Sequence, residues 1–173
     1  MPRPRLIVVT VAAAAVVAAL AVAAARRLTR FEIAERSMAP TYQPGDYVVA
    51  ARVHPDRIRR WDVVIFAHPR RPGLDLVKRV VGLADEIVEV RDGAVLVGGV
   101  PHDHPAATGP TLPDGVHLPG RGEVFVLGDL RPASSADGRE LGPIPAHAVA
   151  WRVVGRYWPL RRFSRRRGAE ARP

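Results

Sequence analysis

The chain has 173 residues, a length that suits one domain with extensions at its ends rather than two full domains. Hydrophobic residues make up 47% and charged residues 25%, so the chain can bury a packed core and is not disordered throughout. It has no cysteine, which excludes a thiol nucleophile, disulfide bonds, zinc sites with thiolate ligands and iron–sulfur clusters.

The net charge of +9 comes from the two ends of the chain. Residues 1–30 hold five arginines and no acidic residue, and residues 161–173 hold six arginines and one glutamate. Residues 31–160 between them have 15 basic and 16 acidic residues and are close to neutral. This distribution favours basic flanks beside a membrane over a nucleic-acid-binding face, so we expect no nucleic-acid partner.

Residues 6–25 form an uncharged run of twenty small and aliphatic residues. A helix of this length spans about 30 Å, the thickness of the hydrocarbon core of a bilayer. Arginines flank the run on both sides, and it is longer than the usual core of a signal peptide, so we expect residues 1–30 to be an uncleaved membrane anchor. A cleaved secretory signal is the alternative, because residues 23–25 (AAA) have the small side chains of a cleavage site.

Beyond residue 30 the pattern favours strands over helices. Short segments rich in β-branched residues predict strands at residues 46–53, 62–66, 76–81, 86–90, 94–97, 123–127 and 148–157. Residues 91–93 (RDG) predict a hairpin turn between two of them. We therefore expect an all-β, largely antiparallel domain over residues 31–160, tethered to one N-terminal transmembrane helix.

Two segments fall outside this strand pattern. Residues 98–122 are a Pro/Gly-rich insert in which His102 and His104 flank Asp103. No third metal ligand is placed beside them, so we interpret the insert as a solvated loop and expect neither metal nor cofactor. We interpret the arginine-rich tail at residues 161–173 as a frayed end, with contact to anionic lipid as the alternative.

Lys78 is the one lysine among 26 basic residues. Arginine keeps its proton in proteins whereas a desolvated lysine can lose it, so Lys78 is a candidate for a task that needs a neutral amine; a chance leftover is the alternative. On a strand, Lys78 shares a face with Leu76 and Val80, where burial would lower its pKa.

Ser37 precedes a turn that Pro40 stiffens, soon after the apolar run. A serine hydroxyl becomes a strong nucleophile only when a base takes its proton. None of the six histidines lies in a segment typical of a catalytic triad, which leaves Ser37 and Lys78 as a nucleophile and base pair.

In this order, four blocks of the chain resemble those of bacterial type I signal peptidases. They are residues 37–41 (SMAPT) with 45–49 (GDYVV), residues 62–66 (DVVIF), residues 78–83 (KRVVGL), and residues 128–131 (GDLR) through 135–139 (SADGR). The resemblance implies a membrane-bound endopeptidase that cleaves exported pre-proteins after small residues, of the Ala-x-Ala type. In such an enzyme Ser37 would form the acyl-enzyme, Lys78 would be the general base, and Ser135 would orient the lysine amine.

The resemblance also implies roles for other residues. The charged residues that would support the site from the last block are Asp129, Arg131, Asp137 and Arg139. Of these, Asp137 and Arg139 match an ion pair of the family. Met38 and Val77 would help to form the pocket for the residue before the cut, and the backbone N–H of Ser37 would supply part of the oxyanion hole.

The chain departs from the family pattern in its last block. Leu130 stands where the family usually has Asn, and Gly138 where it usually has Ser. The block also has one extra residue, so that Ser134 and Ser135 compete for the orienting role. We favour Ser135, because it keeps the family's spacing to Asp137.

Two further departures lie outside that block. Trp61 stands where the family commonly has Gly. Glu35, two residues before Ser37, replaces a small residue that can help to bind the oxyanion, which puts the second donor of the oxyanion hole in doubt.

The resemblance implies a single-pass protein of the plasma membrane with its catalytic domain on the extracytoplasmic side. One alternative is a maturation protease of the same superfamily dedicated to a single partner. Another is a non-catalytic, membrane-tethered β-domain descended from such an enzyme. The sequence predicts no oligomeric state.

Overall fold

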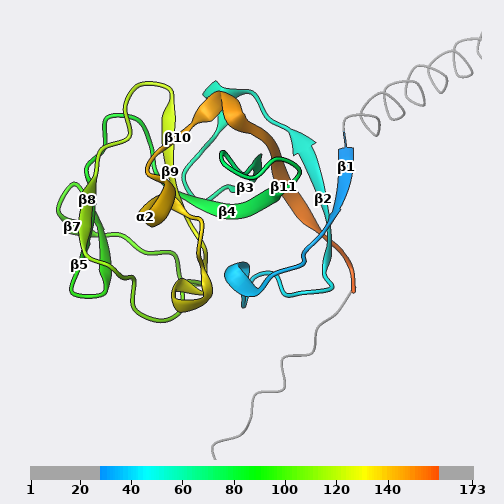
Figure 1. The fold of residues 1–173 in the computed structure, drawn as a ribbon, viewed down its shortest axis with the longest axis horizontal. Coiled ribbons are helices and arrows are strands. Elements are labelled where there is room, and N and C mark those ends of the chain that lie inside the picture. The colour runs from blue at the N-terminus through cyan, green and yellow to red at the C-terminus, as the bar shows by residue number, and fades with distance from the viewer. Residues whose placement is uncertain (1–27, 160–173) are drawn as a thin grey trace, which may run out of the picture.

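A computed structural model describes residues 28–159 (Figure 1). Most of the predicted anchor and the whole arginine-rich tail lie outside these residues, although the first strand begins at Leu28, within the segment assigned to the anchor. Across residues 28–159, no helix has the length and apolar character that a membrane crossing needs.

Two antiparallel sheets make up the described part of the chain. The larger sheet has the order β1-β2-β11-β3-β4-β9-β10 and the smaller one the order β7-β6-β5-β8. The strands of the larger sheet are β1 (Leu28–Glu32), β2 (Tyr47–Arg52), β11 (Val149–Trp158), β3 (Val63–Ala67), β4 (Asp75–Gly82), β9 (Glu123–Leu127) and β10 (Ile144–Pro145). Those of the smaller sheet are β7 (Val100–Pro101), β6 (Ala94–Val97), β5 (Val88–Arg91) and β8 (Gly115–His117).

This arrangement confirms the all-β class, and each of the seven predicted strands coincides with an observed one. At the predicted hairpin, Asp92 and Gly93 have φ angles of 53° and 80°, as a type I′ turn requires. The short strands β7, β8 and β10 were not predicted, because two or three residues are too few to show an alternating pattern. The five-residue strand β1 was not predicted either, because its first residues were assigned to the anchor. Nor were the single turns predicted, namely the 3₁₀ turns η1 (Arg36–Met38), η2 (Pro55–Arg57), η3 (Arg131–Ala133) and η4 (Ala146–Ala148) and the helix α2 (Gly138–Leu141).

The core consists of two apolar clusters on opposite sides of β4 and β9. Val80 packs in the first cluster, with residues of β3, β9 and β11, and its neighbour Val81 packs in the second, with residues of β5, β6 and β9. The central strand β4 is therefore buried on both faces from Lys78 onward. Any polar side chain in this part of β4 loses its contact with water.

The Pro/Gly-rich insert is largely exposed, as its interpretation as a solvated loop predicts, but it also packs against the domain. It contains β7 and β8, and its three histidines, His102, His104 and His117, are partly buried. The Trp61 ring stacks on His102 at a centroid distance of 5.1 Å and lies 5.3 Å from the ring of His104. Aromatic packing thus holds the insert, an interaction that composition alone does not reveal.

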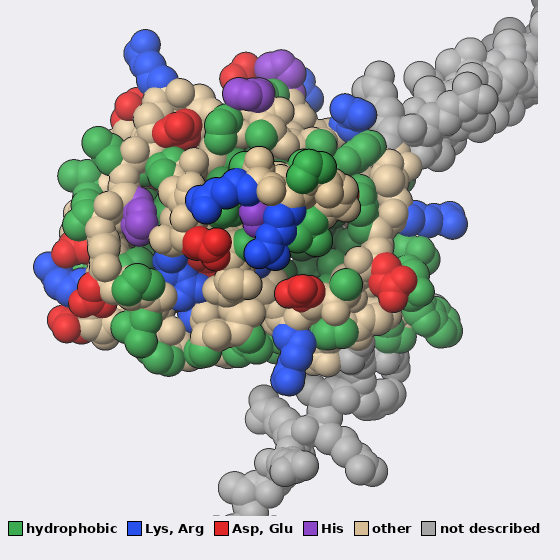
Figure 2. All heavy atoms as spheres, viewed as in Figure 1, with side chains coloured by type: hydrophobic (Ala, Val, Ile, Leu, Met, Phe, Trp, Pro, Cys, Tyr) green, Lys and Arg blue, Asp and Glu red, His purple; other side chains and the backbone are tan. Residues whose placement is uncertain are grey.

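The charged side chains of the domain are of mixed sign. On the face in Figure 2, acidic and basic side chains are interspersed, with apolar side chains between them. This view agrees with the near-neutral composition of residues 31–160.

Gly138, where the family usually has serine, provides a test of the packing around β9. A Cβ atom at this position would lie 2.5 Å and 2.8 Å from ring atoms of the fully buried Phe125. We expect Gly138→Ser to destabilise the domain by about 1–3 kcal/mol, because Phe125 occupies the space of the added side chain. Thermal and denaturant unfolding measure this loss.

The control is Gly155→Ala, since a Cβ atom on Gly155 would meet nothing within 4 Å. We expect this control to change stability by less than about 0.5 kcal/mol. Phe125→Leu should restore part of the stability of Gly138→Ser in the double variant. Equal losses for both single glycine variants would contradict the role of Phe125.

Candidate active site

Predicted site residues from three distant segments line one cleft of about 180 Å³. Ser37 and Met38 come from η1, Val77 and Lys78 from β4, and Ser135 from the loop between η3 and α2. The fold thus brings together five side chains that span almost a hundred positions of the sequence. Asp129 and Arg131 do not line this cleft.

Ser37 lies in the η1 turn, which the last block holds in place. Its carbonyl oxygen accepts a hydrogen bond from the backbone N–H of Leu130, with a length of 3.0 Å. A Cβ atom on Gly128 would lie 2.7 Å from that same oxygen, so only glycine allows the two segments to approach so closely. The position of Ser37, which is 7% exposed, therefore depends on the chain around residue 128.

Lys78 is 3% exposed, and no carboxylate of residues 28–159 lies within ion-pair distance of its amine. Burial lowers the pKa of Lys78, while the more distant charges of Asp137 and Glu35 act in the opposite direction. This confirms the expectation drawn from its apolar neighbours on the strand. An amine in this setting is poised to lose its proton and to act as a base.

The first half of β4 has a free edge beside the cleft. Residues 75–79 pair with β3, but β9 pairs only with residues 79–82 of the strand. Within the described part of the chain, residues 75–78 thus have a strand partner on one side only. An unpaired edge of this kind can accept an extended peptide as an added strand.

The two candidate serines of the last block have different surroundings. Ser134 is buried, and its hydroxyl donates a 2.6 Å hydrogen bond to Asp137. Ser135 is exposed and lines the cleft with Lys78. Between Ser135 and Asp137, Ala136 adopts a φ of 49°, a left-handed conformation that non-glycine residues rarely take.

Asp137 and Arg139 form an ion pair of 2.8 Å, as the resemblance implied. Burial alone would raise the pKa of Asp137, but hydrogen bonds from Arg139 and Ser134 outweigh burial and lower that pKa. The same carboxylate accepts the backbone N–H of Arg139 and so caps α2. Asp137 therefore stays charged and fixes the loop that carries Ser135.

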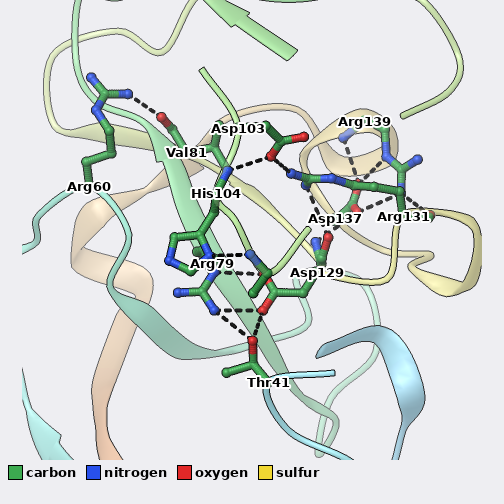
Figure 3. A network of polar contacts seen from close by, with 12 residues as sticks. Thr41, Arg60, Arg79, Val81, Asp103, His104, Asp129, Arg131, Asp137 and Arg139 are labelled. Carbon is green, nitrogen blue, oxygen red and sulfur yellow. Dashed lines mark hydrogen bonds and ion pairs between the residues drawn. The ribbon is translucent and has the colours of Figure 1, made fainter. Parts of the chain in front are cut away.

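A second buried ion pair, between Arg79 and Asp129, was not predicted (Figure 3). The guanidinium of Arg79 donates to both carboxylate oxygens of Asp129, at 2.7 Å and 2.6 Å. Arg79 also donates to the hydroxyl of Thr41 at 3.1 Å, and that hydroxyl donates to Asp129. The sequence did offer one sign of this pair, because Arg79 directly follows Lys78 in a block that resembles the family.

Arg131 connects the last block to the insert. Its guanidinium pairs with Asp103 and donates to the carbonyl of Gly128 at 3.1 Å (Figure 3). The backbone N–H of Thr108 in the insert donates to the carbonyl of Asp129 at 2.8 Å. Asp103, which lies between His102 and His104, thus forms an ion pair with Arg131. Residues 28–159 contain no group of three His, Asp or Glu side chains that could hold a metal ion.

Trp61 occupies a conformation that explains the glycine usual at this position in the resembling family. Its φ is 72°, in the left-handed region that glycine adopts without steric cost and a bulky residue rarely adopts. The carbonyl of Trp61 accepts a 3.0 Å hydrogen bond from Arg79, which holds the backbone in this shape. Its ring contacts with His102 and His104 help to offset the strain.

Comparison with known proteins identifies the family. The family model described as signal peptidase, peptidase S26, matches residues 5–158. The chain belongs to this family. It is therefore a hydrolase, a serine endopeptidase of the S26 family.

The relatives of this S26 peptidase include bacterial enzymes named signal peptidase I. The one from Leptolyngbya laminosa is 33% identical over 144 residues, which cover 76% of this chain and 69% of the relative. The one from Bacillus caldolyticus is 30% identical over 153 residues, covering 79% and 82%. A crystal structure of a signal peptidase I from Enterococcus faecalis matches with a TM-score of 0.47 and 27% identity over 58% of this chain and 96% of the solved one.

Removing one partner of the Arg79–Asp129 pair in this S26 peptidase should strongly destabilise the domain. Their side chains are only 7% and 1% exposed. We expect Asp129→Asn to cost about 3–5 kcal/mol in the free energy of unfolding, because it leaves the guanidinium buried without its counter-charge. Denaturant unfolding measures the loss.

The control is Glu89→Gln, which removes the carboxylate of a more exposed ion pair, Glu89 with Arg91 at 3.2 Å. Water screens that pair, so we expect a loss below about 1 kcal/mol. If Asp129→Asn were no more destabilising than Glu89→Gln, the buried pair would not be what holds these segments together.

Proposed function

We propose that the protein is a signal peptidase that cleaves exported pre-proteins with a Ser37–Lys78 dyad. The observation that carries the proposal is the cleft that Ser37 shares with a lysine that is buried, lacks an ion-pair partner among the described residues and has a lowered pKa. The family and the relatives named signal peptidase I support the substrate class.

The chemistry proceeds in two stages. Neutral Lys78 takes the proton of the Ser37 hydroxyl while the hydroxyl oxygen attacks the carbonyl carbon of the scissile bond. The backbone N–H of Ser37 donates a hydrogen bond to the oxyanion that develops. The protonated amine then gives its proton to the leaving amine of the mature protein, and an acyl-enzyme remains. Lys78 next activates a water molecule that hydrolyses the ester and releases the signal peptide.

The shape of the cleft supports cleavage after small residues. Its volume of about 180 Å³ is modest, and apolar residues such as Met38 and Val77 line it. A substrate strand paired with the free edge of β4 would point alternate side chains into this space. Small residues at the first and third positions before the cut, the Ala-x-Ala pattern, fit such a site.

The proposal includes a membrane location. The apolar run at residues 6–25 has the length of a membrane span, and the family match begins at residue 5 and so includes it. We propose a single-pass protein of the plasma membrane with its catalytic domain on the extracytoplasmic side, where exported pre-proteins emerge. Contact with lipid would then come through the predicted anchor at residues 1–30.

Activity should rise with pH as Lys78 loses its proton. Since burial lowers the pKa of Lys78 from 10.5, the base becomes neutral at a lower pH than a free lysine. We expect kcat/KM on an Ala-x-Ala pre-protein in detergent to rise with pH through a single ionisation below 10.5, because only the neutral amine accepts a proton.

Two variants establish whether this ionisation belongs to the dyad. Ser37→Ala and Lys78→Met should each reduce cleavage at every pH by at least about 10³-fold. Lys78→Met keeps the length of the buried side chain, so its thermal unfolding serves as the control for folding. Substantial cleavage by either folded variant would overturn the dyad, and inactivity of the wild-type protein would favour a non-catalytic domain.

Ser135 is the serine that we propose orients the Lys78 amine. It lines the cleft, whereas the hydroxyl of Ser134 is engaged by Asp137. Ser135→Ala should therefore lower kcat by at least about tenfold and leave the melting temperature unchanged. Ser134→Ala should instead lower stability by about 1–3 kcal/mol, because Asp137 loses a buried hydrogen bond. The opposite pattern of effects would transfer the orienting role to Ser134.

A further inference from the structure

The rim of the catalytic cleft is acidic. Among the described residues that line the cleft, three exposed residues carry carboxylates, namely Glu32, Glu35 and Asp75. Only one exposed lining residue, Arg71, carries a positive charge. The one other cation in the lining is Lys78, which is buried and is needed in its neutral form. The rim thus presents net negative charge to a bound peptide.

Two of these carboxylates come from different elements of the cleft lining. Glu35 precedes the η1 turn that carries Ser37, and Asp75 opens β4, the strand that carries Lys78. Glu35 lies near enough to the Lys78 amine to act on its charge. No ion pair within residues 28–159 involves Glu35, Asp75 or Arg71, whereas Glu32 is hydrogen-bonded to the hydroxyl of Tyr47.

The floor of the cleft differs from its rim. Apolar side chains such as Ile33, Met38 and Leu76 are buried or half-buried there, and the charged side chains of Glu35 and Asp75 are exposed. Along an extended peptide, side chains that point to the floor alternate with side chains that point away from it. The residue between two small floor-facing residues therefore projects toward the charged rim.

We propose that Glu35, assisted by Asp75, selects pre-proteins that carry lysine or arginine between the two small residues that precede the cut. The inference rests on the proposed function and adds a charge preference to it. A cation at this position meets one carboxylate from each wall, whereas an anion there is repelled by both. At distances of several ångströms near a protein surface, such charges raise kcat/KM by about three- to tenfold for a cationic residue, relative to a neutral one. They lower kcat/KM by a similar factor for an anionic residue.

The test compares three pre-proteins that differ only at this position, with Ala-Lys-Ala, Ala-Gln-Ala or Ala-Glu-Ala before the cut. For the full-length enzyme in neutral detergent at low salt, we expect kcat/KM to fall from Lys through Gln to Glu. The ratio between the Lys and Glu substrates should shrink at 1 M salt, because the Debye length is then only about 3 Å.

Variants of Glu35 test whether this residue causes the preference for a cationic substrate residue. Glu35→Gln should reduce the Lys-to-Glu ratio, and Glu35→Lys should invert it. Glu89→Gln on β5, which removes an equal charge in the smaller sheet and outside the cleft lining, should leave the ratio unchanged. Because the ratio compares two substrates on the same enzyme at one pH, a change in the Lys78 pKa caused by the Glu35 variants cancels.

The outcomes separate this inference from the function on which it rests. Equal cleavage of the three substrates by the wild-type enzyme, with loss of activity in Ser37→Ala, would overturn the charge preference and leave the peptidase intact. A wild-type preference that survives Glu35→Lys would also overturn the role of Glu35. Absence of cleavage in the wild-type enzyme would overturn both proposals.

Discussion

The ion pair between Arg79 and Asp129 is the interaction on which the geometry of the cleft depends. Arg79 lies next to Lys78 on β4, Asp129 belongs to the last block, and Thr41, which contacts both, follows the turn that carries Ser37. A single buried guanidinium therefore links the three segments whose side chains line the cleft. Because burial makes an unpaired charge costly, these segments hold together or come apart as a unit.

The unusual state of Lys78 follows from its place in the fold. The strand β4 packs against one apolar cluster on each face, so its side chains from Lys78 onward are removed from water. Arg79 is compensated by Asp129, whereas Lys78 has only distant carboxylates, those of Asp137 and Glu35. The adjacent basic residues thus differ in role, because Asp129 keeps Arg79 charged whereas burial brings Lys78 toward its neutral form.

Several departures from the family pattern are matched by local packing. Gly138 gives space to the ring of Phe125, and Trp61, in a conformation suited to glycine, is held by stacking on His102 in the insert. These matches support a site that keeps its geometry despite the substitutions.

Local signals in the sequence were enough for the all-β class, seven of the eight strands of four or more residues, the RDG hairpin and the burial of Lys78, because alternation and turn chemistry act over a few residues. The motifs also named five of the side chains that line the cleft, those of Ser37, Met38, Val77, Lys78 and Ser135. Only the tertiary structure decided that Arg79 is the partner of Asp129, that the insert packs on Trp61, and that Ser134 binds Asp137 while Ser135 lines the cleft. Such pairings join residues that are distant in the chain or depend on the exact path of a loop, and no local pattern encodes which partner a buried charge or hydroxyl will meet.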